Sequence, residues 1–446
     1  MNKAFLLMKV HLTEKNVYYG LLGWMVLVYF LAGFTNSTSE IYFGFSQLRN
    51  LRAGGMFLVL ILLVLVFTQS NRPALARAFE KLNTWFFSNP LPTFLTAICA
   101  VIVFYLFRTN FINGDGLALE GRFLDVVPLD GAFFSYDEAL EFYIHSRFWA
   151  LTHQAYGWSV NQAYSCLSVL AGGVFIFILL KYCRQLLPEK ALLLAGLCIS
   201  SGYMQLFFGD VENYTLTATV LTGYLLASAL YLNKSLSLVY PASILALALT
   251  FHLLSSFFLP SLAYLYYVAV KRRQFQAVFK SLAVFLVVLG LIWSFMVFNG
   301  LSINNFWNSH VYAASRMSYY WTMAGTPGTN FGDYYFGLFN LLFLLVPGWV
   351  LLIPLAIYRK IEMTEQNIFL SIILLVGFFF FIFWRAQLGP YGDWNLFAVF
   401  GIPLSILIWS NLLRSYSKSR LLVVLVALGM LFFAHSYSWV LYNHNL

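Results

Sequence analysis

The sequence predicts an all-α protein, a polytopic transmembrane helical bundle of about 13 spans that forms one domain over residues 1–446. Hydrophobic residues make up 61% of the chain and charged residues only 10%, whereas soluble globular proteins carry about 25% charged residues. Apolar runs of roughly 20 residues, the length that a helix needs to cross a bilayer, recur along the whole chain. These features exclude a soluble globular protein, a disordered chain and a coiled coil.

The apolar runs give the expected helices in order. Two of them must both fit in the short stretch between Leu238 and Val270, and we expect two short helices with a turn near His252 there. A single long helix in their place would move every later segment to the other side of the membrane. The expected spans begin near Val17, Met56, Leu91, Val160, Ala191, Tyr214, Leu238, Leu254, Ser281, Phe336, Asn367, Leu396 and Leu421.

The charges predict the orientation, because short cytoplasmic loops collect Lys and Arg. With a cytoplasmic N-terminus and thirteen spans, all eleven lysines fall on the cytoplasmic side. A net charge of +9 could also indicate nucleic-acid binding, but no basic stripe is present, and we expect no nucleic-acid partner. We therefore expect a multi-pass protein surrounded by membrane lipid, in a bacterial inner membrane, with its chemistry on the periplasmic or luminal face.

Four segments on the predicted outer side carry the polar chemistry. Two are long, the first outer loop at 108–159 and the second at 299–335, and two are short turns at 209–213 and 385–395. Acidic residues at helix ends on one face differ from the mid-membrane charges that an ion pathway needs. This pattern indicates a reaction or binding site at one membrane–water interface.

The first long loop offers two acidic motifs. In Asn113-Gly114-Asp115-Gly116 the glycines allow unusual backbone angles, so Asp115 is a candidate general base or ligand, although an Asx turn fits the same residues. Further on, Ser135 and Glu138 fit a capping box, and Asp137 suits a positive helix start, so we interpret both acids there as structural. The following amphipathic helix is expected to lie along the membrane surface, with an apolar stripe of Leu140, Ile144, Phe148, Leu151 and Ala155.

The second acidic motif is the tight turn Gly209-Asp210-Val211-Glu212-Asn213 between two apolar helices. Two carboxylates near apolar neighbours are costly unless they are paired or used. We expect Asp210 and Glu212 to form an acid–base pair or to hold a divalent metal, Mg or Mn, the only cofactor that the sequence suggests. The alternative is a solvated turn with Asn213 as a helix cap.

The turn at 385–395 predicts a phosphate-binding site, because Arg385 has a planar donor fork suited to phosphate. Tyr391, Asp393 and Trp394 would contact substrate beside it, unless Arg385 merely extends to the interface. His252 is a second candidate for the phosphate, or an interfacial histidine without a further role. Arg316, among the aromatic residues of the second long loop, would belong to a mobile cover for a polar ligand or to an aromatic belt.

Together these features resemble the GT-C superfamily of integral-membrane glycosyltransferases. The resemblance covers about residues 108–400 and rests on Asn113-Gly114-Asp115-Gly116, on the helix after Tyr136, on the 209–214 turn and on the 393–398 segment. It implies sugar transfer from a polyprenyl-phosphate-linked donor, with Asp115 as base for the acceptor and Asp137 as second choice. One departure is that the acidic loop of the family follows the first helix, whereas here it follows the third.

The sequence therefore favours a hexosyltransferase that acts on a glycan, lipid or protein acceptor. Two alternatives stay open: a transporter or flippase for a lipid-linked glycan, and a glycan polymerase or ligase that uses lipid-diphosphate donors. Against transport, the predicted cytoplasmic loops carry no acidic or aromatic cluster to match the outer ones, and no inverted repeat is visible.

Overall fold

A computed structural model describes residues 14–34, 43–51, 55, 59, 73–110, 116, 117, 119–121, 137–304, 331–358, 360–386, 388–415 and 420–445. Asp115 and Arg316 lie outside these residues, as does Ser135. Within the described ranges every regular element is a helix, which confirms the predicted all-α class.

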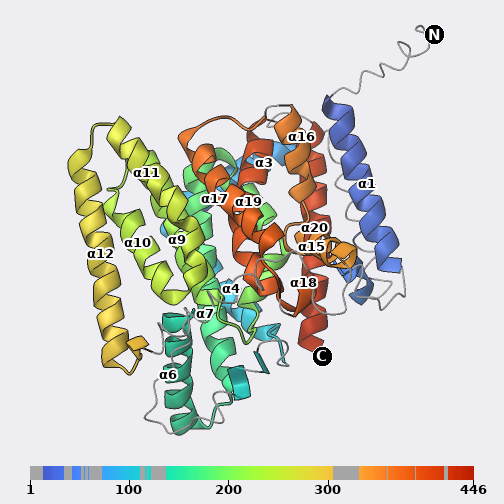
Figure 1. The fold of residues 1–446 in the computed structure, drawn as a ribbon. Helices are drawn as coiled ribbons and strands as arrows, with labels where there is room; N and C mark the ends of the chain where they lie inside the picture. Colours follow the sequence, from blue (N-terminus) through green and yellow to red (C-terminus); the bar gives the residue numbers. More distant parts are fainter. Residues whose placement is uncertain are drawn as a thin grey trace.

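The helices follow one another along the chain as shown in Figure 1. They are α1 (Glu14–Phe34), α3 (Pro73–Ser88), α4 (Pro90–Leu106), α6 (Ala139–Tyr156), α7 (Val160–Leu186), α8 (Ala191–Ile199), α9 (Thr215–Leu232), α10 (Val239–Phe251), α11 (Leu259–Lys271), α12 (Phe275–Phe298), α15 (Phe331–Leu345), α16 (Leu352–Ile357), α17 (Glu365–Phe383), α18 (Gly389–Gly392), α19 (Trp394–Ser415) and α20 (Arg420–Asn445). Short 3-10 helices join several of them, among them η4 (Gly202–Phe207) and η5 (Leu253–Phe258).

Seven helices in the described part are long and apolar enough to cross a membrane, and nine if two bent pairs are each one span. The bent pairs are Arg77–Ser88 with Pro90–Leu106, at 94°, and Gly332–Leu345 with Trp349–Ile357, at 93°. The protein is thus a polytopic helical membrane protein, but a count of 13 spans is not shown. Among the remaining predicted runs, two form shorter apolar helices, Gly23–Gly33 and Val239–Phe251, the run at Ala191 forms a helix of nine residues, and the run at Met56 is largely outside the described residues.

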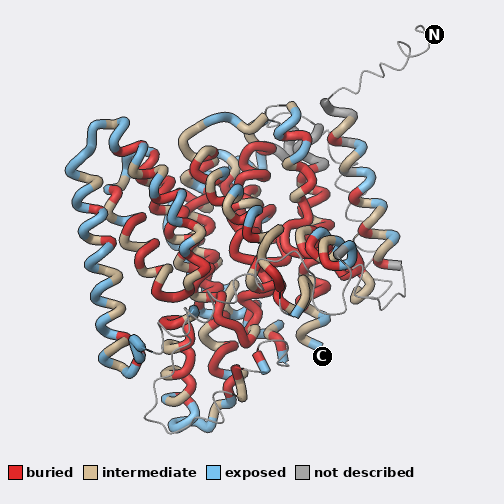
Figure 2. The backbone as a smooth tube through the Cα atoms, in the orientation of Figure 1, coloured by how far each residue is buried: buried red, intermediate tan, exposed pale blue. Residues whose placement is uncertain are grey.

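The helices differ sharply in how much of their surface the protein covers. Of the most apolar window of α19, 89% is buried, against 11% for α12. Figure 2 shows the same contrast between a buried centre and an exposed outer helix. Helix α10 packs between α9 and α12, so α12 forms an outer wall whose apolar side chains suit contact with lipid.

The chain breaks at His252, as the sequence predicts for the uncertain pair. Helix α10 ends at Phe251, His252 is extended (φ −150°, ψ 131°), and η5 begins at Leu253. His252 is therefore outside both helices, and the chain continues through η5 into α11.

Helix α6 differs from its prediction in two ways. It begins at Ala139, so Glu138 is its N-cap residue rather than the third residue of a capping box, and the Glu138 side chain makes no cap hydrogen bond. The predicted stripe also packs against the protein only in its first part, where Leu140 is buried and Ile144 and Phe148 are partly buried, whereas Leu151 and Ala155 are exposed. The buried face also contains polar residues, Glu141, His145 and Ser146.

Candidate functional site

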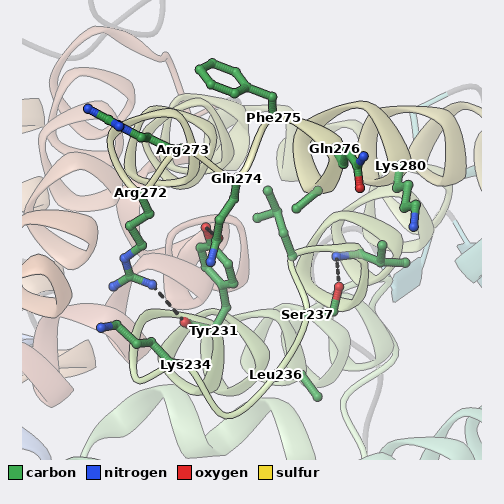
Figure 3. A pocket seen from close by; sticks show the side chains of 13 residues that line it. Tyr231, Lys234, Leu236, Ser237, Arg272, Arg273, Gln274, Phe275, Gln276 and Lys280 are labelled. Carbon is green, nitrogen blue, oxygen red and sulfur yellow. Dashed lines mark hydrogen bonds between the residues drawn. The ribbon is translucent and has the colours of Figure 1, made fainter.

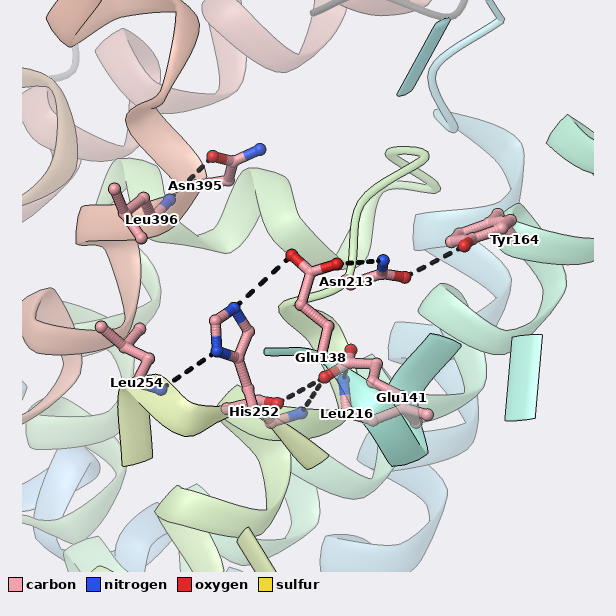
Figure 4. A network of polar contacts seen from close by, with 10 residues as sticks. Glu138, Glu141, Tyr164, Asn213, Leu216, His252, Leu254, Asn395 and Leu396 are labelled. Atoms are coloured by element: carbon pink, nitrogen blue, oxygen red, sulfur yellow. Dashed lines mark hydrogen bonds and ion pairs between the residues drawn. The ribbon is translucent and has the colours of Figure 1, made fainter. Parts of the chain in front are cut away.

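One end of the bundle brings together four segments that are distant in sequence. These are the start of α6, the turn before α9, the break after α10 and the short helix α18. Figure 4 shows the polar network among the first three, with Asn395, from just after α18, near it. We call this region the carboxylate end.

Glu138 lies at the centre of this network. One carboxylate oxygen, Oε2, accepts a hydrogen bond from the Asn213 side-chain amide at 2.8 Å, and the Tyr164 hydroxyl in turn donates to Oδ1 of Asn213 at 3.0 Å. The other oxygen, Oε1, lies 3.6 Å from Nε2 of His252 (Figure 4). The Glu138 side chain keeps 18% of its surface exposed, so a ligand can still reach it.

His252 is held from both sides of its ring. The Leu254 N–H donates to Nδ1 at 3.0 Å, so the neutral imidazole carries its proton on Nε2, toward Glu138. Burial lowers the pKa of His252, but the carboxylates of Glu138, Asp137 and Glu141 outweigh it and leave the pKa above its ordinary value. Both ring nitrogens thus face protein groups, and His252 is placed to orient Glu138.

Glu141 is fully buried one helical turn further along α6. Its carboxylate accepts the N–H groups of Leu216 at 2.8 Å and Thr217 at 3.0 Å, together with the Thr217 hydroxyl. Since these N–H groups belong to the first turn of α9 and have no partner within the helix, Glu141 caps α9 from a separate element. Burial raises the pKa of Glu141 to about 7.

The buried Tyr214 hydroxyl lies in the electrostatic field of four carboxylates. Burial raises the pKa of Tyr214, and the charges of Glu138, Glu212, Asp137 and Asp393 raise it further. The Tyr214 ring stacks on His252 with ring centroids 4.9 Å apart. Four of the predicted site residues thus act on Tyr214, His252 through the ring contact and Glu212, Asp137 and Asp393 through their charges.

Asp210 lies on the far side of the same turn. Gly209 before it has φ +80°, its carbonyl accepts from the Ser165 hydroxyl at 3.2 Å, and the Phe208 carbonyl accepts from the Thr109 N–H at 2.7 Å. These bonds hold the turn against the ends of α4 and α7. Burial raises the pKa of Asp210.

No group of three or more His, Cys, Asp or Glu side chains that could hold a metal ion occurs in the described ranges. The predicted Mg or Mn site at Asp210 and Glu212 therefore gains no third protein ligand from the residues described. It stays a prediction.

The described part of the 385–395 turn is closed by one of its own side chains and by one from α15. Asp393 accepts the Leu388 N–H at 2.9 Å, and the Ala386 N–H donates to the Tyr334 hydroxyl at 2.8 Å. Arg385 is buried beside this closure, with 5% of its surface exposed. These two hydrogen bonds hold the described residues of the turn against each other and against α15.

The two aromatic residues of this turn lie against other rings. Tyr391 contacts Phe43 at 4.9 Å and Trp394 contacts Trp439 at 4.9 Å between ring centroids. Both contacts anchor the turn to the bundle, and a direct substrate contact for either residue stays a prediction.

Sequence reasoning missed four residues of this site: Glu138, Glu141, Tyr164 and Tyr214. Glu138 has a local pattern that fits a helix cap, and its partners lie 75 residues or more away in the chain. One signal for Glu141 was available in the sequence. Glu141 and His145 are four residues apart, so they share one face of the predicted helix, next to its apolar stripe.

Comparison with known proteins supports the fold. No protein-family model matches the sequence, and no curated protein matches it. Among solved structures, the chain is similar to ArnT from Cupriavidus metallidurans, solved bound to undecaprenyl phosphate, with a TM-score of 0.55 and 11% sequence identity. The match covers 79% of this chain and 76% of ArnT. The chain is therefore a polytopic helical membrane protein whose fold is similar to that of ArnT.

Proposed function

We propose that the protein is a glycosyltransferase that moves a sugar from a polyprenyl-phosphate-linked donor to an acceptor on the periplasmic or luminal face. The observation that carries this proposal is the carboxylate end, where Glu138 meets His252 in a fold like that of ArnT. The charges of Glu212 and of Asp393, from the Arg385 turn, act on Tyr214 beside them. The undecaprenyl phosphate bound to ArnT supports a lipid-linked donor for this chain.

The proposed reaction is a displacement at the sugar C1 atom. Asp115 takes the proton of the acceptor hydroxyl, the acceptor oxygen bonds to C1, and the bond from C1 to the phosphate oxygen breaks. A base must lie within hydrogen-bond reach of that proton. Asp137 is the second candidate base, since the Asp137 carbonyl accepts the Leu253 N–H at 2.7 Å and fixes this residue in the carboxylate end.

The leaving polyprenyl phosphate needs positive charge close to it. In our proposal the Arg385 guanidinium supplies this charge, and His252 adds positive charge when its ring is protonated. Glu212 and Asp210 orient the sugar or the acceptor, or hold a divalent metal. The prenyl chain lies in a groove between helices.

A transfer assay tests this proposal. Purified protein in lipid nanodiscs would receive a pool of polyprenyl-phosphate sugars and a membrane extract as source of acceptors. We expect the wild type to release free polyprenyl phosphate, measured by mass spectrometry. Asp115→Asn should reduce the rate by at least about 100-fold, the usual scale for loss of a general base.

Two further variants make the assay specific. Glu80→Gln changes an exposed carboxylate of α3, remote in sequence from the proposed site, and should keep the full rate. Asp137→Asn should keep most of the rate if Asp115 is the base. A full rate in Asp115→Asn with a lost rate in Asp137→Asn would move the base to Asp137, and no release by the wild type would overturn the proposal.

A further inference from the structure

A basic cavity lies at the end of the bundle opposite the carboxylate end. It has a volume of about 630 Å³ and lies between the α9–α10 loop and the α11–α12 loop. Helix α9 begins and helix α10 ends at the carboxylate end. The loop from the end of α9 to the start of α10, which lines the cavity, therefore lies at the opposite end of these helices. Figure 3 shows Lys234, Arg272 and Arg273 on one side of the opening and Lys280 on the other.

The charged side chains that line the cavity are all positive. Four basic side chains line it, and none of its lining residues is acidic. Arg272 is engaged with the protein, since it donates to the Tyr231 and Leu232 carbonyls and pairs with Glu365. The other three, Lys234, Arg273 and Lys280, are exposed and make no side-chain hydrogen bond or ion pair within the described ranges. Three cations without a partner around one cavity indicate an anionic ligand.

The backbone gives an independent argument. Lys234 and Arg273 have φ of 60° and 59°, and they are the two non-glycine residues with positive φ in the described part of the chain. Both follow the last turn of a helix, where a left-handed residue is usually glycine. Their surroundings match, because Ser235 N–H donates to the Leu230 carbonyl and Gln274 N–H to the Ala269 carbonyl, each at the same spacing. The chain thus keeps a basic side chain at two positions where glycine would cost less.

Two helix starts add to the field of these cations. Val239 at the start of α10 and Phe275 at the start of α12 both line the cavity. The α12 N-cap side chain accepts no hydrogen bond from its helix, whereas at the start of α10 the Ser237 hydroxyl accepts the Val239 N–H at 3.4 Å. Helix starts carry partial positive charge and favour anions such as phosphate.

The surroundings favour a lipid as the source of that anion. Helix α12 has the least buried window of the seven candidate spans found in the described residues. Next to the cavity, Phe275 and Tyr240 are more than half exposed and Phe279 is 72% exposed. Basic residues beside exposed aromatic rings are typical of a membrane interface.

We propose that this cavity binds the phosphate of an anionic lipid headgroup through Lys234, Arg273 and Lys280. The proposal is independent of the sugar-transfer function. Binding would tether the α9–α10 and α11–α12 loops to the leaflet at this end of the bundle.

Native mass spectrometry of the full chain in detergent tests the proposal, with phosphatidylglycerol and phosphatidylcholine added in parallel. We expect the wild type to retain phosphatidylglycerol preferentially. Lys234→Gly with Arg273→Gly should weaken its retention by about tenfold or more, because each basic residue near an anionic surface contributes measurably. The same variant should unfold at an equal or higher temperature, since glycine relieves the left-handed backbone.

Controls keep the outcomes separate. Lys181→Gln with Arg184→Gln removes the same charge from the end of α7, outside the cavity, and should keep wild-type retention. Lys280→Gln removes the third cation without changing a turn and should weaken retention alone. Displacement of phosphatidylglycerol by millimolar inorganic phosphate would overturn the lipid assignment in favour of soluble phosphate. Equal retention by the wild type and the glycine variant, or no preference over phosphatidylcholine, would overturn the site itself.

Discussion

Two carboxylates three residues apart on α6 have different surroundings and therefore different roles. Glu138 keeps part of its surface open and meets Asn213 and His252. Glu141 is fully buried, and its carboxylate accepts from the first turn of α9. A group that touches a ligand must be reachable, so Glu138 belongs to the binding surface and Glu141 to the frame that holds it.

The guanidinium of Arg385 is predicted to bind the donor phosphate, and a single substitution tests this role. Arg385→Lys keeps the charge but loses the planar fork that binds phosphate through two N–H groups. We expect the KM for the donor to rise about tenfold, equivalent to about 1.4 kcal/mol, with a smaller change in kcat. Steady-state kinetics over a range of donor concentrations would measure both.

A matched substitution guards this result against a general effect of arginine loss. Arg414→Lys changes an arginine that donates to the Leu186 carbonyl at 3.0 Å, in the last turn of α19. It should leave the donor KM unchanged. A donor KM in Arg385→Lys equal to that of the wild type would argue against phosphate binding at this turn.

The start of helix α9 depends on a residue of another helix. Its N-cap residue, Tyr214, provides no side-chain cap, and Glu141 accepts the two N–H groups instead. An uncapped helix start in a buried place would leave donors without partners. The Glu141 carboxylate thus attaches helix α6 to the start of α9 and helps to position Glu138 against His252.

The pH dependence of stability follows from the pKa of Glu141. Burial raises it from 4.5 to about 7 in the folded protein, so the folded state holds this proton more tightly than the unfolded chain does. The free energy of unfolding should therefore fall as the pH rises from about 4.5 to 7, by about 3 kcal/mol at most. Thermal unfolding at several pH values would measure the fall.

Glu141→Gln separates this effect from other titrating groups. The amide cannot titrate and loses one acceptor, so the variant should be less stable than the wild type at pH 5, by about 1–3 kcal/mol. The difference should shrink toward pH 8. If the free energies of unfolding of the two proteins changed in parallel with pH, Glu141 would not be the cause of the pH dependence.

Close packing between η4 and the end of α15 gives a second prediction for the elements. A Cβ atom on Gly202 would lie 2.1 Å from the Leu344 carbonyl oxygen, and a backbone atom cannot easily move aside. Gly202→Ala should lower the free energy of unfolding by about 1–3 kcal/mol. Gly196→Ala in α8 meets nothing within 4 Å and should be neutral or stabilising. Equal melting temperatures for the two variants would contradict this account.

For the whole molecule, the sequence was sufficient for the class and for much of the helix order. The low charge and the recurring apolar runs predicted a membrane bundle, and the break at His252 was found where the turn was expected. The run at Ala191 shows the limit of this approach. Hydropathy alone does not predict that the α-helix ends at Ile199. The helix ends there just before Gly202, whose backbone packs closely against the Leu344 carbonyl.

The site was predictable only as far as its signals were local. Acidic turns at helix ends pointed to Glu212, Asp137 and Asp393, whose charges all act on Tyr214. The role of Glu138 was not predictable, because a local capping pattern competes with partners from two other segments, at Asn213 and His252. Only the folded chain brings those segments together.

One measurement tests the central claim most directly, because it separates sugar transfer from transport of the intact donor. Wild-type protein in sealed vesicles would be given polyprenyl-phosphate sugars and a membrane extract as acceptor source, and the mass of every donor lipid would be followed over time. We predict that donors lose one sugar and become free polyprenyl phosphate, and that Asp115→Asn leaves them intact. Donors that cross the bilayer with their sugar still attached, without release of polyprenyl phosphate, would contradict the account and identify a transporter.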